Sequence, residues 1–224
     1  IAAIVLYVMN PDAIPEKEIV SVPVLEEEDS SQNVTSREPD PLPVEPDLPG
    51  AAFLKKNWAA FRGLHGLGIT SEHAPLIDFD GETGKNIIWK KKLSLPGYSS
   101  PVIWDDNVFI SGGDREKRSL FCFNADTGDL LWEHEASGIE GSPEEPPKVT
   151  DDTGYAASTP TTDGKRLYAI FGTGDLVCCD LEGTRIWAFN LGVPENHYGH
   201  SSSLITYRGM VIVQFADSAE TLLT

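Results

Sequence analysis

The feature that most constrains the fold is a repeated motif in which an Asp or Asn begins a glycine-containing turn, and the turn leads into a predicted strand that carries a Trp. The motif occurs three times, and its structural residues are Gly84 and Trp89, Gly128 and Trp132, and Gly183 and Trp187. Trp132 follows Trp89 by 43 residues, and Trp187 follows Trp132 by 55. Repeats of about 40 to 50 residues are typical of β-propellers, in which each repeat forms a four-stranded blade.

The chemistry of the motif is structural. Glycine can adopt the positive φ that a tight connection between strands requires, and Trp supplies a large apolar surface for packing one blade on the next. Each Trp is followed by a variable loop and then by a block that reads strand, polar turn, strand; these blocks are Ser99–Gly112, Ser158–Gly172 and Ser201–Gln214. Apolar residues do not recur at helical spacing over any long stretch. The sequence therefore predicts an all-β chain, a bladed β-propeller.

The repeat resembles that of the pyrroloquinoline-quinone (PQQ)-like β-propellers. Several segments are also similar to bacterial envelope proteins of the BamB-like superfamily, namely Trp58–Gly68, Pro96–Pro101, Asp152–Tyr155, Phe171–Gly174 and Tyr198–Ser202. The resemblance covers about residues 57 to 215 and implies a β-propeller of four-stranded blades, with seven or eight blades in a ring around a central channel. Because the chain has room for about three to four blades, we expect residues 51–224 to be a partial propeller.

The first 50 residues differ from the rest. Residues 1–9 are wholly apolar but shorter than the about 20 residues of a membrane-spanning helix, so we expect them to end a membrane anchor or a signal peptide; a β-strand of the domain is the alternative. Residues 10–50 contain eight prolines and eleven acidic residues against two basic ones, which predicts an acidic, disordered stalk. We therefore expect a periplasmic or cell-envelope protein that is secreted or tethered to the membrane by its N-terminus alone.

Charge and the reactive residue types limit the chemistry. The net charge of −18 disfavours nucleic acids and anionic lipid surfaces as partners. The adjacent Cys178 and Cys179 align with Cys122 and Phe123 of the preceding repeat, which predicts small buried side chains on opposite faces of a strand; the resemblance implies a disulfide beside a quinone cofactor as the alternative. The pair His197 and His200 lacks the partner spacing of a zinc site. We predict no catalytic residue and no metal site.

Four residues are candidates for a binding surface. Tyr98, Tyr155 and His200 each stand shortly before the first strand of a strand–turn–strand block, and Tyr198 lies beside His200. Equivalent loops of successive blades converge on one rim of a propeller, so these side chains are predicted to line a shared surface for a ligand or partner. The alternative is that they fill gaps between blades, with their polar atoms hydrogen-bonded.

Three functions are compatible with these observations. The first is a non-catalytic protein-interaction or scaffolding module without a cofactor, whose partners are envelope or membrane proteins. The second, implied by the family resemblance, is a quinoprotein alcohol or sugar dehydrogenase that uses PQQ and Ca²⁺. The third is a module that senses a small ligand or a polysaccharide.

Overall fold

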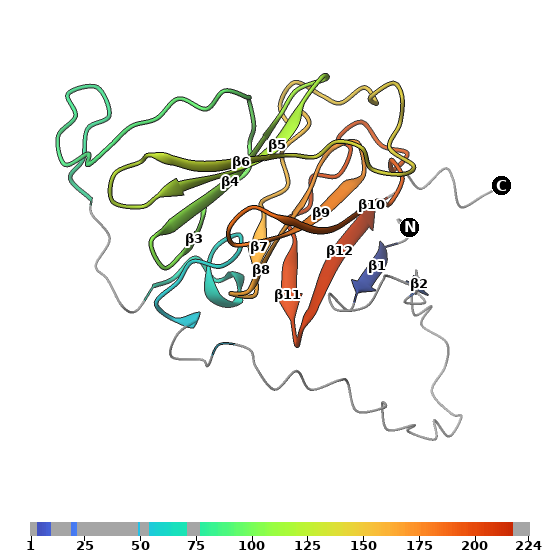
Figure 1. The fold of residues 1–224 in the computed structure, drawn as a ribbon, viewed down its shortest axis with the longest axis horizontal. Coiled ribbons are helices and arrows are strands. Elements are labelled where there is room, and N and C mark those ends of the chain that lie inside the picture. The colour runs from blue at the N-terminus through green and yellow to red at the C-terminus, as the bar shows by residue number, and fades with distance from the viewer. Residues whose placement is uncertain (1–3, 10–18, 22–48, 50–53, 71–76, 217–224) are drawn as a thin grey trace, which may run out of the picture.

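The computed structural model describes residues 4–9, 19–21, 49, 54–70 and 77–216, which form three antiparallel four-stranded sheets (Figure 1). Apart from a helical assignment at Leu54, the helical structure of the described residues is one short 3₁₀ helix, η1 (Leu64–Gly66). The predicted all-β class and the four-stranded blade are thereby confirmed, and the chain is a partial propeller.

The first two sheets are blades in which the strands follow chain order. The first consists of β3 (Val102–Trp104), β4 (Asn107–Gly113), β5 (Arg118–Asn124) and β6 (Leu130–Glu135). The second consists of β7 (Thr161–Thr162), β8 (Arg166–Ile170), β9 (Asp175–Asp180) and β10 (Arg185–Asn190). In both blades the predicted strand–turn–strand block forms the first two strands, and the last strand carries the Trp.

The third sheet combines the two ends of the chain. Its order is β11 (Ile205–Tyr207), β12 (Met210–Ala216), β1 (Ile4–Met9) and β2 (Ile19–Ser21). Strand β1 pairs antiparallel with β12 from Ile4 opposite Ala216 to Met9 opposite Val211. The apolar N-terminal segment is therefore a strand here, the alternative left open by the sequence, and the anchor or signal peptide stays a prediction. Apart from β2 and Pro49, the predicted stalk lies outside the described residues.

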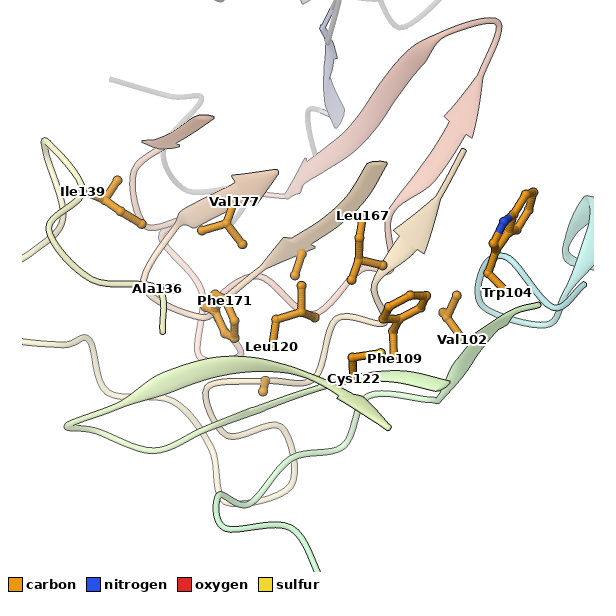
Figure 2. Close-up of a cluster of buried hydrophobic side chains, with 12 residues drawn as sticks. Val102, Trp104, Phe109, Leu120, Cys122, Ala136, Ile139, Leu167, Phe171 and Val177 are labelled. Atoms are coloured by element: carbon orange, nitrogen blue, oxygen red, sulfur yellow. The ribbon is translucent and has the colours of Figure 1, made fainter. Parts of the chain in front are cut away.

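The hydrophobic core lies between the sheets, because successive side chains of a strand point to opposite faces. Figure 2 shows the cluster that joins the first two blades, in which Val102, Phe109, Leu120 and Cys122 face Leu167, Phe171 and Val177. A second cluster joins the other face of the second blade to the third sheet and contains Tyr168, Ile170, Leu176, Cys178, Val211 and Val213. The middle blade is thus buried on both faces, as the stacking of blades requires.

The cysteines occupy the positions that the repeat predicts. Cys122 pairs with Phe109 and Trp132 in the first blade, and Cys178 holds the same place in the second, between Tyr168 and Trp187. All three cysteines are free and buried. Burial raises the pKa of Cys122 and of Cys179 to about 12, so these thiols stay protonated at neutral pH. The prediction of small buried side chains is confirmed.

Each of the first two motif tryptophans packs on the turn of the following repeat. Gly128 has a φ of +69°, and a Cβ added there would lie 2.5 Å from the ring of Trp89. Gly183 has a φ of +88°, and its Cβ would lie 2.6 Å from the ring of Trp132. Each indole N–H also donates to a backbone carbonyl of that turn, at 2.7 and 3.0 Å. Glycine is needed at both places because the conformation and the contact exclude a side chain.

The first repeat requires a correction. Its turn forms as predicted, with the Asp80 carboxylate accepting from the backbone N–H of Glu82 at 2.8 Å. The residues that lead to Trp89 are not a strand, however, and run as irregular chain. The physical reason is that no other strand of the described residues lies beside them to supply hydrogen bonds. Gly84 likewise has no atom within 4 Å of the place of a Cβ, unlike its two counterparts.

Candidate functional site

The two ends of the strands form two different rims. The turn rim holds the repeated turns 124–129 and 180–184, together with the hairpin between β3 and β4. The loop rim, at the opposite end of the same strands, holds the hairpin between β4 and β5 and the long connections 136–160 and 191–204. All four predicted binding residues lie in segments that belong to the loop rim.

Hydroxyl groups connect successive blades beneath the loop rim. The backbone N–H of Ser100 donates to Thr159 Oγ1 at 3.0 Å, and the backbone N–H of Thr159 donates to Ser203 Oγ at 3.2 Å. Ser158 Oγ donates to the carbonyl of Ser202 at 2.8 Å. Ser158 and Thr159 are buried, so these contacts are shielded from water and give the rim a fixed base.

A buried carboxylate holds the long connection between the first two blades against the second. Asp175, which is fully buried, accepts from Ser142 Oγ at 3.0 Å and from Thr173 Oγ1 at 2.6 Å. Asn190 Nδ2 donates to its other oxygen at 2.8 Å, and Arg118 Nη2 lies 3.8 Å from the carboxylate. The charge is thus compensated by hydrogen bonds and a nearby guanidinium, as burial demands. Because Ser142 belongs to the connection, Asp175 positions it over the blades.

Tyr98 and Tyr155 line the larger of two hollows on the loop rim, with a volume of about 500 Å³. The Tyr98 hydroxyl donates to the carbonyl of Asp151, and the Tyr155 hydroxyl donates to the carbonyl of Pro147, both at 2.7 Å. Each hydroxyl is therefore used to fix the connection 136–160, and the rings form walls of the hollow. Tyr98 is 60% exposed.

Charged groups also line the larger hollow. Arg115 comes from the hairpin between β4 and β5, and Lys148 comes from the long connection. The acidic residues there are Asp114 and Asp151. Asp114 Oδ1 accepts from two backbone N–H groups of its own turn, each at 2.8 Å. The hollow therefore combines aromatic walls with two basic and two acidic side chains.

Tyr198 and His200 line the smaller hollow, with a volume of about 180 Å³. His200 is only 4% exposed, its Nε2 lies 2.9 Å from the carbonyl oxygen of Gly192, and its ring meets Phe215 edge-on at 5.2 Å. This is the gap-filling arrangement that the sequence left as an alternative. Tyr198 is half exposed and is the side chain of this pair that solvent reaches.

The four predicted residues therefore lie in two adjoining hollows and not in one. Segment 149–154 separates the hollows: the backbone N–H of Thr150 donates to the carbonyl of His197 at 3.0 Å, and Val149 Cγ1 lies 3.2 Å from the place of a Cβ on Gly199. The role of these residues in binding stays a prediction.

The sequence analysis missed the two basic residues of the larger hollow. Arg115 and Lys148 are 33 residues apart and belong to no motif. They come together because an antiparallel blade places the connection between its second and third strands at the same end as the loop to the next blade. An available signal was that both residues lie in loops assigned to one rim.

The donor set that the PQQ alternative requires is not found in the described part of the chain. Calcium takes six to eight oxygen ligands, several of them carboxylates. The described residues contain no group of three or more His, Cys, Asp and Glu side chains that could hold a metal ion, so they do not fit that site. No helix among them is long and apolar enough to cross a membrane.

Comparison with known proteins identifies a family. The sequence profile described as outer membrane protein assembly factor BamB matches residues 65–216. No match was found among curated proteins. Among solved structures, the crystal structure of BamB from Moraxella catarrhalis is 22% identical, with a TM-score of 0.40, and the match covers 57% of this chain and 38% of that one. The chain thus corresponds to less than half of the length of that structure.

Proposed function

Because the chain belongs to the family of the outer membrane protein assembly factor BamB, we propose that it is a non-catalytic propeller module of the cell envelope that binds other proteins through its loop rim. Its partners are envelope or membrane proteins, and the N-terminal residues tether it to the membrane. In the tethered protein, residues 1–9 are the end of the anchor and do not pair with β12 as strand β1. The observation that carries the proposal is the pair of adjoining hollows at one end of the blades, lined by Tyr98, Tyr155 and Tyr198.

The construction of the rim supports this function. Aromatic side chains are enriched where proteins bind one another, because they give a large contact area at small entropic cost. The rim is held by the buried Asp175 and by the hydroxyl contacts between blades, so its shape is preorganised, which lowers the entropic cost of binding. The turn rim is instead occupied by contacts between the repeats.

Site-specific crosslinking tests the proposal. A photoreactive amino acid placed at Tyr98 or Tyr198 in the full-length protein should crosslink to a defined envelope protein in membranes of the source organism. Matched control positions are Leu131 and Ile186, which are 52% and 50% exposed on the outer strands. Crosslinks of the same strength from the control positions, or none from the rim, would show that the rim is not the binding surface.

The location is tested separately. The full-length protein fused to a reporter that is active only outside the cytoplasm should give signal, and removal of residues 1–9 should release the module from the membrane fraction. An inactive reporter would contradict the envelope location, and a membrane-bound truncated protein would contradict tethering by these residues. Neither result would alter the crosslinking test.

A further inference from the structure

We infer that the larger hollow of the loop rim binds the C-terminal carboxylate of a partner polypeptide that ends in an apolar or aromatic residue. The inference rests on the proposed function, since it specifies the chemistry by which the loop rim holds a protein. The larger hollow has a volume of about 500 Å³, which is within the range of about 300–1,000 Å³ for ligand pockets.

The walls of the hollow favour an apolar group. The rings of Tyr98 and Tyr155 line it together with Pro96 and Val149. Because both tyrosine hydroxyls already donate to backbone carbonyls, the rings offer their faces and edges to an occupant. An apolar or aromatic side chain that entered the hollow would add to the binding free energy by burying apolar surface and by contacting the tyrosine rings.

The basic residues favour a carboxylate. The chain has 35 acidic and 17 basic residues, so a basic side chain has many acidic groups with which to pair. Lys117, next to the hollow, does so with Glu133 at 2.7 Å. Within the described residues, Arg115 and Lys148 form no ion pair; Arg115 Nη1 donates to the backbone carbonyl of Pro146 at 3.3 Å. Two cations at one opening complement one carboxylate, and a guanidinium can bind it through two hydrogen bonds.

The acidic residues limit the charge that the occupant carries. Asp114 and Asp151 also line the hollow. The carboxylate of Asp114 is held within its own turn by two hydrogen bonds from backbone N–H groups. Asp151 remains to repel an anion, and the net charge of −18 adds to that repulsion at low ionic strength. A single terminal carboxylate therefore suits the hollow, whereas a run of acidic residues does not.

Fluorescence anisotropy with the full-length protein tests the inference. The probe is a fluorescein-labelled hexapeptide of Gly and Ser that ends in Phe with a free carboxylate, compared with the same peptide as its C-terminal amide. We expect the acid to bind at least about ten-fold more tightly, because only the acid can form charge-assisted hydrogen bonds with the two cations. Replacing the terminal Phe by Gly should also weaken binding by about ten-fold.

Variants assign the effect to the hollow. The double variant Arg115→Gln/Lys148→Gln should weaken binding of the acid by about 20-fold and leave binding of the amide unchanged. Lys92→Gln/Arg208→Gln changes the net charge equally with exposed residues outside the hollow and should have no effect. Asp151→Asn should tighten binding of the acid by a few-fold, because it removes the repelling carboxylate.

Three outcomes would overturn the inference: equal binding of acid and amide, an equal effect of the control variant, or binding of 3-phenylpropionate, measured directly by calorimetry, when neither peptide binds. The last outcome would identify a pocket for small free acids. Crosslinking from Tyr98 and Tyr198 is measured independently, so a rim that captures a protein without discriminating acid from amide would leave the proposed function standing.

Discussion

The turn rim and the loop rim are built from the same strands, yet they differ in how much of their structure repeats. On the turn rim, a Cβ added at Gly128 or at Gly183 would meet the ring of the preceding Trp at nearly the same distance. On the loop rim, the connection 136–160 has no counterpart of the same length, and the two hollows differ in volume and in lining.

The difference shows that packing between blades determines the sequence of the turn rim, whereas the loop rim is free to vary and to carry binding residues. The contact between an indole and a glycine turn holds one blade on the next, so it must recur with each blade. Loops that only have to reach the next blade are free to vary in length and composition, and binding residues are therefore found on them. Substitutions on the turn rim should accordingly change stability, and substitutions in the hollows should change binding.

The largest effect is expected at Gly183. Gly183→Ala places a Cβ at a positive φ and against the ring of Trp132, which should lower the free energy of unfolding by about 3 kcal/mol. Urea denaturation measures this change. Gly84→Ala is the matched control, because Gly84 has a φ of +77° but open space around it, and should cost only about 1 kcal/mol. Equal losses at the two positions would show that the contact with Trp132 adds nothing.

A smaller effect is expected at the hydroxyl contacts beneath the loop rim. Ser158→Ala removes a buried donor and leaves the carbonyl of Ser202 without its 2.8 Å hydrogen bond, which should cost about 1 to 2 kcal/mol. Ser201→Ala, at an exposed serine nearby, should change stability by less than about 0.5 kcal/mol. If thermal unfolding gave the same midpoint for both variants, the fixed base of the loop rim would need another explanation.

The contact between the first two blades should depend on pH through His134. Burial, followed by the charge of Arg185, lowers the pKa of His134 in the folded protein. The unfolded chain therefore binds a proton on this histidine more readily than the folded protein does. The stability that neutral His134 contributes is fully present above its ordinary pKa of about 6.5, and it is lost as the pH falls through the lowered pKa of the folded state. His134→Gln should lose less stability between pH 7 and pH 5 than the unmodified protein does. Parallel pH profiles of unfolding would contradict this prediction.

The smallest effect on stability is expected in the larger hollow. Arg115→Gln/Lys148→Gln removes two basic groups that have no ion pair in the described part of the chain, so the free energy of unfolding should change by less than about 0.5 kcal/mol. Comparing this variant with Ser158→Ala in one denaturation series would sharpen the distinction between binding and packing positions. A loss above about 1 kcal/mol would place the two cations among the packing residues.

Much of the fold was predictable because each blade packs on the next through the same residue types, which therefore recur in the sequence at the spacing of the blades. The turn glycines, the strands of Trp132 and Trp187, and the alignment of Cys122 with Cys178 all follow from that period. The prediction failed for the strand before Trp89, because the sequence carries the motif whether or not a neighbouring strand is available for pairing. The sequence also left two alternatives for Ile4–Met9, a strand and the end of a membrane anchor or signal peptide, because a run of apolar residues suits a sheet and a membrane equally.

The candidate site was predictable only in part. Four residues were predicted to lie on one rim because they stand shortly before the first strand of a strand–turn–strand block: Tyr98, Tyr155, Tyr198 and His200. The sequence could not separate Tyr98, which is exposed, from His200, which is buried against Phe215, because the difference arises from tertiary contacts that no motif records. Arg115 and Lys148 were missed since their proximity depends on the course of the loops.

The way in which each indole rests on the following glycine turn has a consequence for evolution. Because the first two repeats make the same contact with their successors, a duplicated gene segment encoding one whole repeat would bring both halves of that contact with it. Blade number can therefore change in single recombination events without a new interface, while the loops at the other end diverge to suit new partners.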